Sequence, residues 1–381
     1  MTTELTIDAR WLKTGIGRYT QSVLSGLRHH LPGVRLSGIA QSKDASLVST
    51  FVDRVDICNA GIYGVREQWA LPRLIGKTAA LYAPHYNIPV LWRGRLLVTI
   101  HDLNHLLDQG YRNTWRSSLY ARPMLRRAVQ QADVIVTPSR YTMHRLHEEF
   151  GVDHSRVQVI PCCVAPCFSK REKTVARARI AQNPGVSRPF ILFVGSGAPN
   201  KNLQLLLAAV ATLGQRRRDT PLVVVAGQQA KGGPQMQRLL QIPQLQNRII
   251  WLDKLPDTAL ADLYSAALMT VMPSFEEGFG LPVIESMACG TPVLCSRAAS
   301  LPEVAGDAAL YFSPYSSEEL AGAIETLIDS NSTQERLIHA GLVRAAAFSR
   351  DEFCRRQASA IHTLLGTDDL PNRRARREEI A

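Results

Sequence analysis

The feature that most constrains this 381-residue chain is a recurring alternation of short apolar runs with longer helical stretches. In the first half the runs are Leu36–Ala40, Ala80–Ala83, Leu96–Ile100, Val134–Thr137 and Val157–Ile160. In the second half they are Phe190–Val194, Leu222–Ala226, Ile249–Leu252, Leu268–Met272 and Val293–Cys295. A stretch such as Gly17–His29 carries apolar side chains at helical spacing. Strands separated by helices predict βαβ units and therefore parallel sheets.

The length and composition indicate two domains. The chain is long for one open-sheet domain, and its 45% apolar and 20% charged residues are typical of a globular protein. The polar stretch 169–188, rich in Lys and Arg, is interpreted as the connection. We therefore predict a first domain over 1–168 and a second over 189–350. A helix over 351–366 and a basic tail over 367–381 follow, and the tail is interpreted as a solvated terminus in preference to a membrane contact.

Several classes of protein are disfavoured. No run approaches the roughly 18 apolar residues of a membrane span, and the N-terminus shows neither the basic nor the apolar region of an export signal. The seven cysteines, an odd number, indicate reduced thiols and a cytoplasmic protein. The cluster Cys162, Cys163 and Cys167 lacks the spacing of a zinc site, so no metal site is expected.

The positive charge is concentrated in the first half. Residues 1–170 hold 21 Lys and Arg against 12 Asp and Glu, so they carry +9 of the total +11. No nucleic-acid-binding motif accompanies this charge, and an anionic membrane face or lipid-linked acceptor fits it better. The segment 111–128 is either a basic amphipathic membrane helix or an ordinary surface helix, which Pro123 is expected to divide into two pieces.

The segment 276–292 carries two carboxylates, Glu277 and Glu285, across a glycine-bearing turn and the start of a predicted helix. It lies between two predicted strands, and ligands of open α/β sheets bind at the carboxyl ends of strands. The backbone N–H groups near Phe279 and Gly280 are expected to face an anion at the helix N-terminus. Both carboxylates are expected to point into one crevice, where they would accept hydrogen bonds from sugar hydroxyls.

A second candidate site follows the strand 190–194. A glycine turn, Gly195-Ser196-Gly197, leads to Lys201, which is expected to open a helix. A lysine in this position suits a diphosphate, as a point charge and a donor. Neither this glycine pair nor Gly15-Ile16-Gly17 continues to the third glycine of a dinucleotide fingerprint, which disfavours a dehydrogenase.

The Glu277-x7-Glu285 segment resembles the Glu-x7-Glu motif of retaining glycosyltransferases with the GT-B fold, in particular glycosyltransferase family 4. The resemblance continues through Ser300–Val304 and Gly306–Ala309. It implies two facing Rossmann-like domains with a nucleotide-sugar cleft between them. The first domain would bind the acceptor and the second the donor, and the helix 351–366 would return to the first domain.

The resemblance also implies roles in the second domain. The first glutamate, Glu277, would hydrogen-bond the transferred sugar, and Glu285 would bind the ribose. Lys201 would neutralise the departing diphosphate. The residues that would line the donor around them are Gly195, Ser196, Asn200, Gly278, Phe279, Gly280 and Leu281. Many family members carry arginine where Asn200 stands here, and some carry another where Ser196 stands. The residue that would supply a second phosphate-binding cation therefore stays open, with Lys231 as a candidate.

In the first domain the stretch Asp8–Tyr19 looks like the family's glycine-rich loop, with Gly15, Ile16 and Gly17 facing the cleft. Arg18 is interpreted either as a contact for an anionic acceptor or the donor phosphates, or as a helix-surface residue.

Three further residues follow predicted strands. His101 resembles the family histidine that contacts the transferred sugar, with a packed turn residue as the alternative. His85 is expected on the acceptor side. Ser139 is predicted to cap a helix, beside Arg140, which would contact phosphate or the domain interface.

The resemblance implies a metal-independent, retaining hexosyl transfer from a nucleoside diphosphate sugar, with no cofactor. No Asp-x-Asp metal motif is present. The overall pattern is similar to bacterial mannosyltransferases of surface polysaccharides, so GDP-mannose and a lipid-linked glycan are the expected substrates. The alternatives are UDP-glucose as donor, a nucleotide-sugar epimerase and a non-catalytic binding protein.

Overall fold

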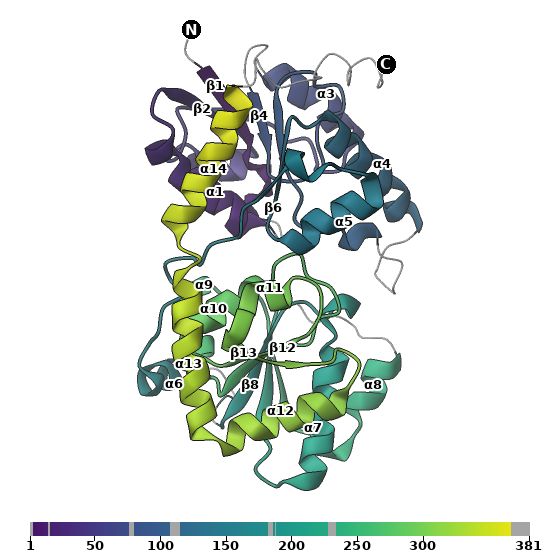
Figure 1. The fold of residues 1–381 in the computed structure, drawn as a ribbon, viewed down its shortest axis with the longest axis vertical. Coiled ribbons are helices and arrows are strands. Elements are labelled where there is room, and N and C mark those ends of the chain that lie inside the picture. Colours follow the sequence, from purple (N-terminus) through teal and green to yellow (C-terminus); the bar gives the residue numbers. More distant parts are fainter. Residues whose placement is uncertain are drawn as a thin grey trace. The chain divides into compact units, whose positions relative to one another are not determined.

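The computed structural model describes residues 3–13, 16–75, 80–106, 115–181, 186, 188–227 and 234–366. Gly15, Lys231 and the basic tail 367–381 lie outside these residues, as do the start of the segment 111–128 and parts of the predicted connection. The chain divides into two compact units (Figure 1). The first contains Met1–Leu106, Asn113–Cys163 and Arg350–Ala381, and the second contains Val164–Ser349.

The first unit is built on a seven-stranded parallel sheet in the order β3-β2-β1-β4-β5-β6-β7. Its strands are β1 (Thr3–Asp8), β2 (Val34–Ala40), β3 (Arg54–Ile57), β4 (Ala80–Ala83), β5 (Leu96–Thr99), β6 (Val134–Thr137) and β7 (Val157–Val159). Its helices include α1 (Gly17–His30), α2 (Ala45–Val48), α3 (Val65–Leu74), α4 (Trp115–Gln131), α5 (Arg140–Phe150) and α14 (Arg350–Leu365).

The second unit has a six-stranded parallel sheet in the order β10-β9-β8-β11-β12-β13. Its strands are β8 (Phe190–Val194), β9 (Leu222–Ala226), β10 (Ile249–Leu252), β11 (Met269–Met272), β12 (Val293–Ser296) and β13 (Ala309–Phe312). Its helices include α6 (Lys173–Ile180), α7 (Leu203–Arg216), α8 (Pro234–Leu240), α9 (Asp257–Ala266), α10 (Leu281–Ala288), α11 (Leu301–Ala305), α12 (Ser317–Asp329) and α13 (Asn331–Ala346). Two Rossmann-like parallel-sheet units confirm the predicted fold class.

Both sheets are buried on their two faces, which explains why the strands read as continuous apolar runs. In the second unit, for example, β9 is buried along its whole length, and apolar side chains of α7 and α12 pack over one face of the sheet. A second apolar cluster, which includes Phe190 and Tyr264, covers the other face. The strands β1, β3 and β13 are not among the predicted apolar runs. Polar residues interrupt the apolar pattern of β1 and β3, and β13 is only four residues long and directly follows the short 3-10 turn Gly306–Ala308.

Two local expectations differ from the structure. Pro123 lies inside one continuous helix, α4, so it does not divide the segment into two pieces. The stretch 169–188, predicted as a polar connection, contains α6. This helix buries Ala176 and Ile180 and packs against α9 of the second unit, because its apolar side chains recur at i and i+4.

The closing helix α14 packs on α1 within the first unit (Figure 1). Gln357, on its buried face, donates to the Tyr19 hydroxyl at 2.7 Å and accepts from the Tyr82 hydroxyl at 3.0 Å. The helices approach closely at Gly26 of α1, where an added Cβ would lie 1.9 Å from Cys354 Sγ. Glycine is required there by the close approach and not by its backbone conformation.

We expect Gly26→Ala to destabilise the first unit by about 1–3 kcal/mol, because a methyl group overpacks the α1–α14 contact. Glycine in a helix interior normally costs about 0.5–1 kcal/mol relative to alanine. Helix propensity alone would therefore make Gly26→Ala stabilising, the opposite of the change expected here. Thermal unfolding measures the effect. Gly322→Ala on α12 is the matched control, since a Cβ there meets nothing within 4 Å and should stabilise. A Gly26→Ala protein as stable as the parent would contradict the packing described here.

Candidate functional site

Each sheet reverses its strand order at one point, and ligands of open α/β sheets bind outside the carboxyl ends of the strands at such a point. In the second unit the reversal lies between β8 and β11, and in the first unit between β1 and β4. The segments that follow these four strands carry most of the residues selected from the sequence. The topology therefore gathers them at two places, one in each unit.

In the second unit, Lys201 reaches its position through a short 3-10 turn, Pro199–Lys201, after β8. It does not open the following helix as expected, because Asn202 adopts a left-handed conformation and α7 begins only at Leu203. The side chain of Asn202 donates to the carbonyls of Pro273 and Pro314, at 3.0 and 2.9 Å. These bonds attach the turn after β8 to the ends of β11 and β13.

Glu277 follows β11 and lies opposite Lys201. The Lys201 Nζ donates to Glu277 Oε1 at 2.5 Å, and the Ser274 hydroxyl donates to the same oxygen at 2.8 Å. The Glu277 backbone carbonyl accepts from Ser300 Oγ at 2.9 Å. Glu277 is only 7% exposed, so its carboxylate is held by the ammonium and the hydroxyl. The place where the strand order reverses, between β8 and β11, is called the switch point below. The segments that follow these two strands thus meet there in one charge-assisted contact.

The turn after Glu277 presents backbone toward the start of α10. Gly280 has φ of 93°, which favours glycine, and a Cβ there would lie 2.7 Å from a Leu301 methyl group. Phe279 is buried against Phe348 with ring centroids 5.6 Å apart, so this residue offers only its backbone to a ligand. Gly278 precedes it, and Leu281 begins α10; in the first turn Pro282 carries no N–H, and the Val283 N–H donates to the Gly280 carbonyl at 2.9 Å.

Glu285 lies on the buried face of α10 and is 1% exposed. The Tyr264 hydroxyl of α9 donates to its Oε2 at 2.9 Å. The two carboxylates therefore have different partners, Lys201 and Ser274 for Glu277 and Tyr264 for Glu285. The structure gives Glu285 a more enclosed environment than the sequence suggested.

The remaining donor-side positions have distinct surroundings. Asn200 is buried, and its side chain donates to the Glu276 carbonyl at 3.2 Å while its carbonyl accepts from the Phe275 N–H at 2.8 Å. It therefore joins the turns after β8 and β11. Gly195 directly follows β8, and Ser196 is exposed.

In the first unit, His101 follows β5 and lies edge-on to the Tyr19 ring at 4.6 Å. Its Nε2 lies 2.9 Å from the Pro84 carbonyl. A carbonyl only accepts, so Nε2 carries the proton and Nδ1 is the acceptor nitrogen of the neutral ring. Burial lowers the pKa of His101, although the Pro84 hydrogen bond and nearby Asp102 oppose the shift.

The other predicted residues of this unit occupy helix starts and the end of β4. Ile16 precedes α1, and its carbonyl accepts from the Thr20 N–H at 3.0 Å. Gly17 is buried and Arg18 is partly exposed. Ser139 accepts from the Thr142 N–H, which confirms it as the cap of α5, and Arg140 begins that helix on its exposed side. His85 is buried and stacks on Trp11 with centroids 4.1 Å apart.

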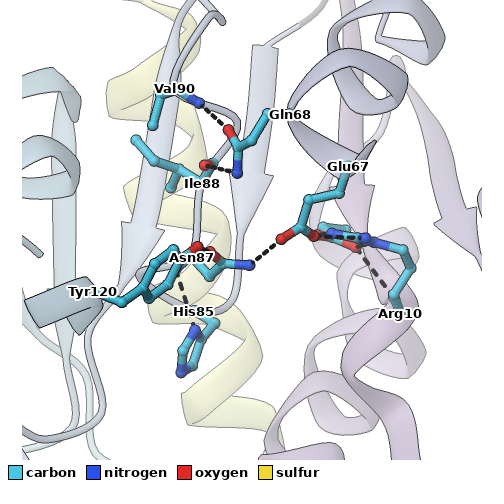
Figure 2. Close-up of polar contacts among 9 residues, drawn as sticks. Arg10, Glu67, Gln68, His85, Asn87, Ile88, Val90 and Tyr120 are labelled. Atoms are coloured by element: carbon cyan, nitrogen blue, oxygen red, sulfur yellow. Dashed lines mark hydrogen bonds and ion pairs between the residues drawn. The ribbon is translucent and has the colours of Figure 1, made fainter. Parts of the chain in front are cut away.

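A buried polar network at the β1–β4 switch point was missed from the sequence (Figure 2). Arg10, after β1, binds Asp8 through Nε at 2.8 Å and a terminal nitrogen at 2.7 Å, and it binds Glu67 of α3 at 2.9 Å. Burial alone would lower the pKa of Arg10, but the two carboxylates overcome it and raise that pKa. Asn87, after β4, donates to Glu67 at 2.8 Å and accepts from the Tyr120 hydroxyl at 2.6 Å.

One residue of this network, Glu67, could have been identified as buried from the sequence. Glu67 stands four residues before Leu71 and eight before Ile75, so it shares their apolar helix face. A carboxylate on such a face needs a buried partner. Nothing in the sequence identifies that partner as Arg10, which is 57 residues away.

Comparison with known proteins agrees with this architecture. A model of glycosyl transferases group 1 matches residues 176–343, and a model of Glycosyltransferase Family 4 matches residues 65–166. The O-antigen chain mannosyltransferase B of Escherichia coli is 28% identical over 79% of this chain and 77% of its own. A D-inositol 3-phosphate glycosyltransferase of Corynebacterium glutamicum is 29% identical over 68% of this chain and 64% of its own.

The solved structures show the same fold. Sucrose-phosphate synthase from Thermosynechococcus elongatus aligns with a TM-score of 0.74 at 19% identity, covering 96% of this chain and 100% of that chain. HepE from Anabaena, solved with UDP-glucose, aligns with a TM-score of 0.74 at 17% identity, covering 95% and 100%. The fold is that of the GT-B glycosyltransferases. The chain belongs to the family 4 and group 1 glycosyltransferases that the two models describe.

Two further observations concern only the described part of the chain. There, no helix combines the length and the apolar character needed to cross a bilayer. His, Cys, Asp and Glu side chains of the same residues form no group of three or more that would hold a metal ion.

We expect His101 to make the stability of the first unit depend on pH. Its pKa is lowered on folding, so below about pH 6.5 the unfolded chain binds a proton here that the folded chain does not. Acidification from about pH 7.5 to 5.5 should therefore lower the free energy of unfolding. Urea unfolding of the parent and of His101→Gln measures this contribution, and the variant should show a smaller pH dependence. Equal slopes for the two proteins would contradict it.

Proposed function

We propose that this protein transfers a hexose from a nucleoside diphosphate sugar, with retention and without a metal, to a hydroxyl of a glycan or lipid-linked glycan. GDP-mannose is the proposed donor. The observation that carries the proposal is the Lys201–Glu277 pair at the β8–β11 switch point, 2.5 Å between Nζ and Oε1. A cation for phosphate and a carboxylate for sugar hydroxyls stand together where such sheets bind ligands.

The donor would be recognised by several groups with separate tasks. Lys201 would face the diphosphate and take up its developing charge, helped by the backbone N–H groups near Phe279 and Gly280, before α10. Glu277 would accept from sugar hydroxyls, and Glu285 from the ribose, with Tyr264 holding its carboxylate. His101 would accept a sugar hydroxyl proton at Nδ1, because its Nε2 donates to Pro84.

The proposed reaction is a substitution on one face of the sugar. The acceptor oxygen bonds to the anomeric carbon while that carbon's bond to the phosphate oxygen breaks. The acceptor proton passes to an oxygen of the leaving phosphate, so no protein nucleophile is needed. Preorganised charge at the leaving group is then the main contribution of the protein to the rate.

The identity of the sugar is supported by the relatives. O-antigen chain mannosyltransferases of Escherichia coli and Salmonella typhimurium are 28% and 25% identical to this chain. These names support mannose and a role in bacterial surface polysaccharide synthesis, hence a cytoplasmic protein with peripheral contact to the membrane face. The UDP-glucose bound to HepE makes UDP-glucose the second candidate donor.

A thermal-shift panel of GDP-, UDP-, ADP- and dTDP-sugars tests the donor. We expect GDP-mannose to raise the melting temperature most, since a ligand at 100 times its dissociation constant adds about 2.7 kcal/mol. A larger shift with UDP-glucose would replace mannose by glucose in the proposal. Incubation of the donor alone checks for an epimerase, which would convert it without an acceptor, and no shift with any donor would overturn the proposal.

We expect Lys201→Ala to slow hexose transfer about 10²-fold, because a positioned charge at the leaving group is lost. Lys254→Ala, at an exposed lysine after β10, is the matched control and should transfer at the parent rate. Melting temperatures must accompany the rates, since the substitution also leaves Glu277 without its cation. A folded Lys201→Ala protein within about twofold of the parent rate would exclude the proposed role.

A further inference from the structure

The residues at the β1–β4 switch point of the first unit are joined by an extensive set of buried polar contacts. Asp8, Arg10, Glu67 and Asn87 form a continuous buried set of ion pairs and hydrogen bonds that ends at the Tyr120 hydroxyl (Figure 2). The Asn87 backbone N–H also donates to His85 Nδ1 at 3.2 Å. Figure 2 shows the His85 ring extending from Asn87 away from Glu67. The network thereby holds two aromatic rings, Tyr120 and His85.

These rings belong to an aromatic cluster that also includes Trp11, Tyr63 and Tyr86, whose ring centroid lies 4.1 Å from that of His85. Tyr63 lies edge-on to Trp11, His85 and Tyr120, with centroid distances of 5.8, 6.0 and 5.8 Å. Trp11 and His85 are buried beneath it, whereas Tyr63 is 45% exposed. Tyr63 is therefore the outermost ring of the cluster, and the others support its edges.

The backbone at Tyr63 is unfavourable for a side chain. Its φ is 66°, and it is the third residue of a turn closed by the Gly64 N–H on the Gly61 carbonyl at 3.0 Å. Glycine or asparagine is preferred in such a position. A tyrosine there is strained, and strain of this kind gathers at binding and active sites. The chain thus keeps an aromatic ring at a position whose backbone conformation favours glycine.

We propose that the Tyr63 ring, supported by Trp11, His85 and Tyr120, is the platform on which the terminal pyranose of the acceptor glycan lies. The electron-rich face of an aromatic ring attracts the C–H groups on one face of a pyranose. Sites of this kind combine apolar rings with a few placed polar groups. The inference rests on the proposed glycosyl transfer, because it assigns the acceptor of that reaction.

The charges of the site select the class of sugar. Asp8 and Glu67 outnumber Arg10 by one negative charge, and Asp102 adds another close to Tyr63. A phosphorylated or uronic acid residue would be repelled here. The platform therefore takes a neutral hexose.

The test measures binding of neutral disaccharides, mannobioses and glucobioses, to the full chain by saturation-transfer NMR. In the parent we expect saturation to pass from aromatic protons to the sugar. Tyr63→Gly should weaken binding about 3- to 10-fold, the range of a stacking contact, while remaining at least as stable as the parent because glycine accepts a φ of 66°. Tyr63→Phe keeps the ring and should bind within about twofold of the parent.

Trp69→Ala is the matched control, since Trp69 is an exposed aromatic residue of α3 outside the cluster. It should bind disaccharides as the parent does. The inference is overturned if the parent binds none of the disaccharides, or if Tyr63→Gly binds them as tightly as the parent. The GDP-mannose thermal shift is measured on the same proteins: a preserved shift leaves the proposed transfer standing, and a shift absent from the parent overturns that proposal separately.

Discussion

The reversal of strand order beside the first strand of each sheet is the constraint on which the rest of the structure depends. Parallel strands end at one edge, and the loops after β8 and β11, or after β1 and β4, must diverge where the order reverses. Side chains from both loops then reach each other without crossing a helix. Lys201 meets Glu277 across one such point, and Arg10 and Asn87 meet through Glu67 across the other. The same reversal of strand order thus brings together a Lys–Glu pair in the second unit and a larger polar network in the first.

The chemistry differs because the balance of charge and burial differs. In the second unit one ammonium and one carboxylate are paired, with the Lys201 side chain partly exposed. In the first unit Arg10 is 2% exposed and Glu67 is fully buried. Removing one partner from such a network typically costs about 3–5 kcal/mol, because a charge is left unpaired in the interior. The first network is therefore enclosed in the interior, whereas the second pair keeps its ammonium partly in contact with solvent.

Local sequence carried much of the fold because the strands are buried on both faces and read as apolar runs. The local pattern missed strands whose apolar runs are short or interrupted by polar residues, such as β1 and β3. It also failed where tertiary packing overrides a local rule. Pro123 was expected to break a helix, yet α4 continues through it. In the candidate site, too, local sequence identified individual residues but not the contacts between them. Lys201 and Glu277 could be selected because each follows a strand and carries a charge, whereas their contact joins residues 76 positions apart.

By itself, the sequence determined the two Rossmann-like parallel-sheet units, the glycosyltransferase family and the positions of the charged residues at strand ends. These depend on short-range periodicity and on motifs that lie within a few residues of each other. Only the tertiary structure decided that Lys201 pairs with Glu277, that Glu285 turns to Tyr264, and that Asp8, Arg10, Glu67 and Asn87 form one network. Such contacts require a specific strand order to bring distant segments together, and the apolar pattern is the same for any order in which every strand is buried.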